Sequence, residues 1–270
     1  MADLRIGVIG AGGRMGGAIV RQTHETPGVT LVAACENAGH AAIGRDAGEV
    51  AGIGANGVKI GAQAEAVFEA CDAAIEFSTP DASVAHAKLA AARKRIHVIG
   101  TTGLDAAAER ALAEAAKSAT IVHAPNMSLA VNLLFALTRQ VASALGPDFD
   151  IEILEMHHRH KVDAPSGTAL GLGRAAAEGR GVKLADVQQD ARHGITGARR
   201  RGDIGFAVLR GGDVVGDHTV IFAADGERLE LTHKGSSRQI FARGAVHAAL
   251  WARGKPPGRY SMADVLGLKT

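Results

Sequence analysis

The segment that decides the fold is residues 4–16, which reads LRIGVIGAGGRMG. Its first part, residues 4–9, is a short apolar run of the kind that forms a buried strand. A glycine turn at residues 10–16 follows at once, and the pattern then predicts a helix to about Thr23. A strand, a glycine turn and a helix in this order form the context of a dinucleotide-binding fingerprint.

The glycines of this turn depart from the strict G-x-G-x-x-G pattern, because position 15 is Met. Gly10, Gly13 and Gly16 instead give G-x-x-G-x-x-G, which can do the same physical work. They permit a tight turn, a close approach of the backbone to a pyrophosphate, and close packing of the helix on the strand. The alternative is a glycine-rich turn that binds no ligand.

Four further apolar runs, at residues 29–35, 73–77, 97–100 and 120–123, alternate with helical patterns at 64–69, 80–92 and 105–117. This alternation predicts an α/β fold with a doubly wound parallel sheet, in which ligands bind beyond the carboxyl ends of the strands. The residues at those ends form a candidate nucleotide-binding rim. The rim comprises Gly10, Ala11, Gly12, Gly13, Arg14, Met15, Glu36, Ser78, Thr79, Gly100, Thr101, Thr102, Ala124, Pro125, Asn126 and Met127.

Glu36 ends the second predicted strand, where an acidic side chain accepts hydrogen bonds from the ribose hydroxyls of an adenosine. The alternative is an exposed carboxylate at the end of a strand. Asn37 follows and is neutral, whereas an Arg there would have indicated binding of a 2′-phosphate. Arg14 is still able to reach such a phosphate or to stack on adenine, so both NADH and NADPH stay open as cofactors.

A second informative segment, residues 155–168, reads EMHHRHKVDAPSGT and follows an apolar strand predicted at 151–156. Ser166 is a good N-cap for a small-residue helix that runs to about Glu178. The amides of Gly167 and Thr168 would then be free at the helix start, where an anion is favoured. Three imidazoles and Lys161 lie close by in the sequence, so we expect an acidic substrate to bind here.

His157, His158 and His160 supply the imidazoles, and their spacing does not fix which of them faces the substrate. A hydride delivered to an unsaturated carbon leaves negative charge on a neighbouring atom, and a His is able to neutralise it. Lys161 binds a carboxylate or stabilises that charge. Purely structural histidines are the alternative. A zinc site is disfavoured because Lys161 would repel the metal, and hydrolysis through Ser166 lacks a G-x-S-x-G context.

The second half of the chain has a different pattern. A long apolar helix is predicted at 128–145, and a polar and basic region at 179–202 is predicted to be loops. Strands at 204–210, 214–223 and 228–234 are joined by hairpin-type turns, which indicates an antiparallel sheet, and a helix follows at 239–251. We therefore expect a dinucleotide-binding domain of residues 1–128 and 239–270, and a substrate-binding and oligomerisation domain of residues 129–238. The cleft between them should hold both ligands, with Arg238 as a further candidate contact to the substrate.

Composition argues against a nucleic-acid-binding, membrane or secreted protein. The net charge of +2 in 270 residues gives no broad basic surface for nucleic acid, and the run Arg199, Arg200, Arg201 is interpreted as a solvated loop. Apolar runs fall short of a membrane span, and the N-terminus enters a strand without a signal peptide. Cys35 and Cys71 are expected to be buried free thiols, which suits a reducing cytoplasm.

Five segments resemble one family, the 4-hydroxy-tetrahydrodipicolinate (dihydrodipicolinate) reductases of bacterial lysine and diaminopimelate biosynthesis. They are VIGAGGRMG at 8–16, GTTG at 100–103, APNMS at 124–128, EMHHRHKVDAPSGTA at 155–169 and THKGSSR at 232–238. They occur in the family's order over nearly the whole chain. The resemblance implies a Rossmann-type domain and an α+β substrate domain whose mixed open sheet builds a homotetramer.

The resemblance also implies roles for single residues. His157 would be the general acid/base and Lys161 the proton donor, while His158, Gly167 and Thr168 would bind the dicarboxylate substrate. The rim residues other than Ser78 and Thr79 would bind NADH or NADPH. Asn37 stands where some members use an Arg for the NADPH phosphate, and Ala130 where a Gly is common. A non-catalytic NAD(P) sensor and a reductase of another small acid are the alternative functions.

Overall fold

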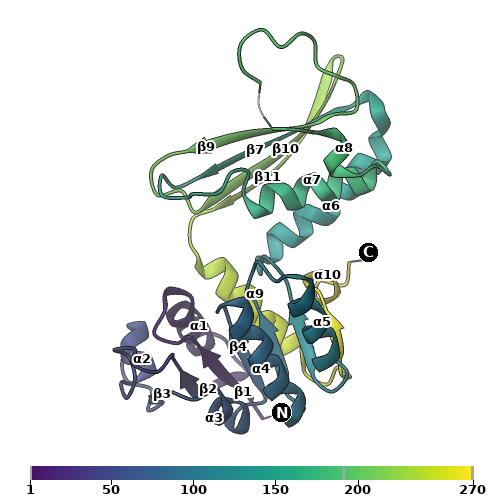
Figure 1. Ribbon diagram of the computed structural model, residues 1–270. Helices are drawn as coiled ribbons and strands as arrows, with labels where there is room; N and C mark the ends of the chain where they lie inside the picture. Colours follow the sequence, from purple (N-terminus) through teal and green to yellow (C-terminus); the bar gives the residue numbers. More distant parts are fainter. Residues whose placement is uncertain (1, 191, 269–270) are drawn as a thin grey trace. The chain divides into compact units, whose positions relative to one another are not determined.

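The computed structural model describes residues 2–190 and 192–268, and the chain divides into two compact units (Figure 1). Unit 1 comprises Met1–Leu129 and Arg238–Lys269, and unit 2 comprises Ala130–Ser237. Unit 2 is thus one continuous segment inserted between two parts of unit 1.

Unit 1 is built on a seven-stranded sheet in the order β12-β6-β5-β4-β1-β2-β3, and all of its strand pairs are parallel. The order reverses between β1 and β4, as in a Rossmann-type fold, so the predicted doubly wound sheet is confirmed. The strands are β1 (Leu4–Ile9), β2 (Val29–Cys35), β3 (Ile60–Gly61), β4 (Ala73–Glu76), β5 (Ile96–Ile99), β6 (Thr120–His123) and β12 (Gly258–Tyr260). The sequence patterns missed β3 and β12, which have two and three residues.

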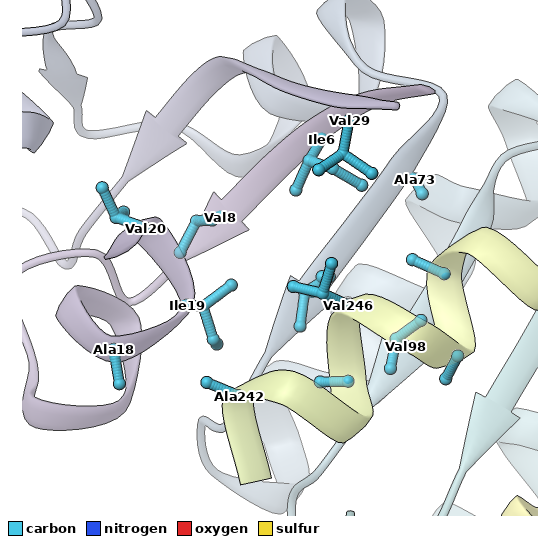
Figure 2. Close-up of a cluster of buried hydrophobic side chains, with 14 of the residues drawn as sticks. Ile6, Val8, Ala18, Ile19, Val20, Val29, Ala73, Val98, Ala242 and Val246 are labelled. Carbon is cyan, nitrogen blue, oxygen red and sulfur yellow. The ribbon is translucent and has the colours of Figure 1, made fainter. Parts of the chain in front are cut away.

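Helices cover both faces of this sheet. Helices α1 (Arg14–Glu25) and α9 (Gln239–Ala252) pack on one face, where Ile6 and Val8 of β1 meet Ile19 and Val246 (Figure 2). Helices α3 (Ala64–Ala70), α4 (Pro80–Arg93) and α5 (Ala106–Ala115) pack on the other face. Two short helices, α2 (Ala47–Ala51) and α10 (Met262–Val265), complete the unit.

Two glycines permit close packing beneath the rim. A Cβ at Gly16 would lie 2.0 Å from the carbonyl oxygen of Gly10, so α1 starts in direct contact with the turn. A Cβ at Gly244 in α9 would lie 1.7 Å from the carbonyl oxygen of Met127. Real Cβ atoms do not approach oxygen so closely, and both positions therefore require glycine.

Unit 2 contains a mixed five-stranded sheet in the order β11-β10-β7-β9-β8. Strand β7 (Asp150–His157) is parallel to β9 (Ile204–Arg210) and antiparallel to β10 (Gly216–Ala224). The edge strands are β8 (Gln188–Gln189) and β11 (Glu227–Gly235), and the helices are α6 (Leu129–Leu145), α7 (Gly167–Gly179) and α8 (Leu184–Val187). A 3₁₀ turn, η1 (Gly146–Asp148), joins α6 to β7.

The expectation of an antiparallel sheet joined by hairpins was half right. Strands β10 and β11 form a tight hairpin, because Ala224 pairs with Glu227 across the turn of Asp225 and Gly226. Strands β9 and β10 do not pair, since β7 lies between them. The turn after Arg210 therefore crosses over β7. The region 179–202 also contains α8 and β8, where only loops were predicted.

The two faces of the unit 2 sheet differ. On one face Ile151 and Ile153 of β7 pack with Phe206 and Phe222 against α6 and α7. The alternating residues Leu154 and Met156 face the other way and are half-buried, and on β9 Leu209 is exposed. One face thus forms the core of the unit, and the other is an open face on which these apolar side chains lie beside Glu152 and Asp217.

The expectation that every apolar run falls short of a membrane span needs a correction. In the described part of the chain one helix, Leu129–Asp148, is long and apolar enough to span a membrane by length and composition, with a mean hydropathy of 1.3. Its residues Leu134 and Ala142 are buried in the core of unit 2. The apolar residues of this helix therefore include ones that pack in the core of unit 2.

The interpretation of the arginine run as solvated was wrong for Arg199. Its guanidinium donates to Asp150 Oδ1 (2.7 Å), to Glu152 Oε1 (2.9 Å) and to the carbonyl oxygens of Ile151 and Asp203. Only 18% of its side chain is exposed, against 69% for Arg200. Arg199 therefore anchors the loop before β9 onto β7.

Candidate functional site

The glycine turn of unit 1 has the geometry of a pyrophosphate-binding turn. Gly10 has a φ of +77°, which favours glycine, and the N-cap of α1 is Gly13, which has no side chain to occupy the helix start. Gly13 and Arg14 are exposed, and the first turn of α1 carries no acidic residue. The amides and the dipole of this helix start therefore fit an anionic group.

Glu36 lies at the end of β2 and holds the turn in place. Its Oε2 accepts a hydrogen bond from the amide of Gly12 (3.0 Å), and its Oε1 accepts one from the amide of Asn37 (2.9 Å). Each carboxylate oxygen has a second lone pair, so Glu36 is still able to accept from a ribose hydroxyl. The carboxylate thus shapes the turn as well as offering a ligand contact.

Thr101 points away from solvent. Its hydroxyl oxygen accepts hydrogen bonds from the amide of Ser78 (3.0 Å) and from Oγ of Ser83 (2.8 Å), and its carbonyl oxygen lies 3.2 Å from Nε2 of His123. The neighbouring Thr102 is exposed. Of the two threonines, Thr102 is therefore the one with an exposed side chain, while Gly100 and Thr101 are buried.

The rim segment after β6, residues 124–127, also contains both buried and exposed residues. Ala124 and Met127 are buried in the core of unit 1, at 3% and 0% exposure. Pro125 is exposed, and half-buried Asn126 accepts the amide of Ser128 through Oδ1 (2.8 Å). At the glycine turn, Ala11 is buried, Met15 packs partly buried on the same core, and Arg14 is exposed. The side chains of Ala124 and Met127 therefore belong to the core of unit 1.

Unit 2 gathers ionisable groups at the end of three adjacent strands. Alternation along β7 places Glu155 and His157 on the helix-covered face. Strand register places Arg210 of β9 beside His157, and His218 of β10 beside Glu155. With Ser166 at the start of α7, these residues form the imidazole cluster: Glu155, His157, Ser166, Arg210 and His218.

Glu155 is the centre of this cluster and is 1% exposed. Its Oε2 lies 2.5 Å from Nδ1 of His157 and 2.9 Å from Nη1 of Arg210. Its Oε1 accepts the amide of Ser166 (3.0 Å) and Nη2 of Arg210 (3.2 Å). Burial alone would raise the pKa of Glu155, but these donors outweigh it and hold that pKa below the usual value.

Ser166 is the N-cap that the sequence predicts. Its Oγ accepts the amide of Ala169 (3.1 Å) and lies 3.2 Å from Nε2 of His218. Gly167 is exposed with open space where a Cβ would be, and Thr168 is half-buried. The first turn of α7 carries no acidic residue, so this helix start suits a carboxylate of a ligand.

The two buried imidazoles are held neutral by their surroundings. Burial lowers the pKa of His157, and Glu155 opposes that shift. Burial also lowers the pKa of His218 to about 4, with a further contribution from His157. The two rings meet edge to face with centroids 5.1 Å apart. His157 therefore lies next to an imidazole, that of His218, which is neutral near pH 7.

Lys161 lies in the loop between β7 and α7, with Nζ 2.8 Å from Oδ1 and 2.9 Å from Oδ2 of Asp163. His158 is half-buried, and exposed His160 lies with its ring centroid 6.3 Å from that of His158. The predicted site residues of unit 2 therefore occupy one strand end, one loop and one helix start.

Sequence reasoning missed four members of this neighbourhood: Glu155, Asp163, Arg210 and His218. The period of two along β7 was a usable signal for Glu155, which is two residues from His157. Arg210 and His218 come from other strands, and only the strand register brings them in. In the described ranges 2–190 and 192–268, no group of three or more His, Cys, Asp or Glu side chains is arranged to hold a metal ion.

Comparison with known proteins gives the family. Residues 4–127 match the model of the N-terminal part of dihydrodipicolinate reductase, and residues 130–266 match the model of its C-terminal part. The chain is 55% identical over 268 residues to the 4-hydroxy-tetrahydrodipicolinate reductase of Afipia carboxidovorans, covering 99% of this chain and 98% of the relative. It is 57% identical over 261 residues to that of Ruegeria pomeroyi, covering 97% of each chain.

A solved structure agrees at the level of the fold. The dipicolinate-bound dihydrodipicolinate reductase from Paenisporosarcina sp. TG-14 superposes with a TM-score of 0.77 at 20% identity, covering 97% of this chain and 98% of that one. The two family models together span both units. The chain therefore belongs to the dihydrodipicolinate reductase family, whose members are the NAD(P)H-dependent 4-hydroxy-tetrahydrodipicolinate reductases of lysine and diaminopimelate biosynthesis.

Proposed function

We propose that this chain reduces 4-hydroxy-tetrahydrodipicolinate to tetrahydrodipicolinate, with unit 1 binding NADH or NADPH and unit 2 binding the diacid. The observation that carries the proposal is that one buried carboxylate, that of Glu155, contacts both His157 and the helix start at Ser166. A proton-exchanging group and an anion-binding helix start are thereby held in one small volume, which suits an acidic substrate that must be protonated.

In unit 1 the first turn of α1 and the glycine turn would hold the pyrophosphate, and Glu36 the adenosine ribose. Backbone groups of Gly100, Ala124, Asn126 and Met127 would line the rest of the nucleotide. When bound, the nicotinamide supplies a hydride. The fit rests on the positive φ of Gly10, the uncapped start of α1 and the position of Glu36 at the end of β2.

The choice between the two nucleotides depends on two oppositely charged side chains. Glu36 would repel a 2′-phosphate, whereas exposed Arg14 would attract it. We expect kcat/KM for NADH to exceed that for NADPH, because the Glu36 carboxylate is fixed by two amides. Comparing the two nucleotides in the wild type and in Arg14→Ala tests this, since Arg14→Ala should reduce kcat/KM for NADPH alone.

In unit 2 the amides of Gly167 and Thr168, together with His158, would bind one carboxylate of the substrate, and Lys161 would face the diacid. Hydride arriving at an unsaturated carbon leaves negative charge on a neighbouring atom. That unsaturated carbon forms when the substrate hydroxyl leaves as water together with a hydrogen of the adjacent carbon. After hydride addition a proton from His157 or Lys161 neutralises the charge. One hydride and one proton enter for each product and water formed.

A direct assay separates this function from its rivals. Freshly made substrate should cause NADH absorbance to fall in the near ultraviolet, and a panel of other small unsaturated acids should give much slower turnover. An NAD(P) sensor would bind the nucleotide without turnover. The imidazole cluster favours the enzyme, because a sensor does not need a proton-exchanging group beside an anion site.

The assembly is a further part of the proposal. The open face of the unit 2 sheet carries Leu154, Met156 and Leu209, which are apolar and incompletely buried. Covering this face in a homotetramer would remove that surface from water. Sedimentation of the wild type and of Leu209→Glu tests the assignment, since the charge should dissociate the tetramer. A cytoplasmic location stays a prediction that is compatible with the two free, buried cysteines.

A further inference from the structure

A second buried polar cluster lies in unit 1, and the mechanism above makes no use of it. Glu76 is the last residue of β4, His97 belongs to β5, and His86 belongs to α4. Glu76 and His97 are both 0% exposed. Nδ1 of His86 lies 2.9 Å from Oε2 of Glu76, and Nε2 of His97 lies 2.8 Å from Oε1. We refer to these three residues as the Glu76 cluster.

Burying a carboxylate costs folding free energy unless other groups pair with it. Glu76 lies buried at the end of a central strand, so other interactions must offset this cost. Burial alone would raise the pKa of Glu76, but the two imidazoles outweigh it and keep that pKa below the usual value. The carboxylate is therefore an anion and acts only as a hydrogen-bond acceptor.

This anion is joined to two loops of the rim. Oγ of Ser78 donates to Oε2 of Glu76, and the amide of Ser78 donates to Oγ1 of Thr101 (3.0 Å). Oγ of Ser83 donates to the same Thr101 oxygen (2.8 Å). Ser78 follows β4 and Thr101 follows β5, so one chain of hydrogen bonds runs from the Glu76 cluster to both loops.

The same chain of hydrogen bonds explains why the hydroxyl of Thr101 points into the protein. With its hydroxyl accepting from Ser78 and Ser83, the exposed side of this loop is left to Thr102. The position of the two loops therefore depends on an acceptor that is buried below them. We propose that Glu76 is a positioning residue for nucleotide binding, which acts through Ser78 and Thr101 to set the loops after β4 and β5.

The proposal rests on the nucleotide site assigned above, and it predicts a binding effect rather than a chemical one. Ser78→Ala removes the donor to Glu76, and Glu76→Gln removes the charge with little change of shape. Each should raise the Kd for NADH about tenfold in a fluorescence titration, because a hydrogen bond to a buried charge is lost. The kcat at saturating NADH and the KM for the diacid should stay within about twofold of wild type.

Three further variants distinguish positioning from direct contact and from loss of fold. Ser78→Thr keeps the hydroxyl and should restore the wild-type Kd. The double variant of Ser78→Ala with Glu76→Gln should bind NADH no more weakly than the weaker single variant, because both changes break the same chain. Ser118→Ala makes the same chemical change at an exposed position before β6, and it should leave the Kd unchanged.

Opposite results would overturn the proposal. An unchanged Kd in Ser78→Ala, additive effects in the double variant, or an equal rise of Kd in Ser118→Ala would each contradict it. If Glu76→Gln does not fold, the comparison of Ser78→Ala with Ser78→Thr decides alone. Failure of the wild type to bind NADH would refute the nucleotide site itself and is thereby distinguished from failure of the positioning role.

Discussion

The carboxylate of Glu155 lies 2.5 Å from Nδ1 of His157, and this contact fixes the tautomer of the imidazole. An ionised carboxylate only accepts hydrogen bonds, so Nδ1 of the neutral ring carries the proton and Nε2 has the free lone pair. A Cβ at Gly216 would lie 3.0 Å from that Nε2, so glycine leaves room for the ring. Glu155 thus sets the orientation of the His157 ring.

Glu155→Gln should move the pH profile. The carboxylate stabilises the imidazolium form of His157, so its loss lowers the pKa of His157 further. Where the protonated imidazole is the active form, the decline of kcat/KM toward high pH should begin about one pH unit lower, with kcat reduced about tenfold or more. The control is Glu152→Gln, the same change on the opposite face of β7. An unshifted profile would remove Glu155 from this role.

Lys161→Ala should separate chemistry from nucleotide binding. Loss of the ammonium removes the assigned proton donor and a charge that faces the diacid, so kcat/KM should fall about a hundredfold or more. The Kd for NADH should stay at the wild-type value, because Lys161 belongs to unit 2. Lys183→Ala, an exposed residue of the same unit, is the matched control. Equal losses in turnover and NADH binding would refute the assignment.

Asp163→Asn should improve substrate binding. Asp163 holds Nζ of Lys161 through both carboxylate oxygens and adds a negative charge close to where a dianion is expected. Neutralising it frees the ammonium and removes repulsion, so the KM for the diacid should fall a few-fold, about 1 kcal/mol at most. Steady-state kinetics at low salt measure this. Asp213→Asn, in an exposed turn, is the control, and a raised KM in Asp163→Asn would show that the ion pair orients Lys161 productively.

His218 should make unit 2 less stable in mild acid. Its pKa is about 4 in the folded chain against about 6.5 when unfolded, so between these values the unfolded state binds the extra proton. The stability is complete above pH 6.5 and is lost as the pH falls toward 4, by roughly 3 kcal/mol in total. Denaturant unfolding followed by circular dichroism should show this slope, and His218→Gln should flatten it. The exposed His24→Gln should leave the slope as in wild type.

The features that the sequence predicted correctly are those with a local cause. The glycine turn, the strand ends of unit 1 and the N-cap at Ser166 each depend on a few neighbouring residues, and the structure contains all of them. The uncapped start of α1 follows from Gly13 alone. Because parallel strands end at the same edge, local patterns were enough to assemble the rim.

The features that it missed have causes distant in the chain. Asp150 and Glu152 bind Arg199 from nearly fifty residues away, so a run of three arginines looked solvated. The turn after Arg210 has hairpin chemistry, but β7 pairs with β9 and β10 from both sides. The inward orientation of the Thr101 hydroxyl depends on Ser78 and Ser83, which lie about twenty residues earlier in the sequence. Local sequence periodicity does not identify which distant segments pair with one another.

The insertion of unit 2 has a consequence for synthesis on the ribosome. The nucleotide-binding unit completes its core with α9, and its sheet with β12, yet both are translated after the whole of unit 2. A nascent chain that ends near Ser237 would leave Ile6, Val98 and their neighbours without the helix that covers them. Unit 2 is then able to fold while the chain is still attached to the ribosome. Unit 1 cannot complete its core until α9 has emerged, and its apolar strands are accessible to chaperones until then.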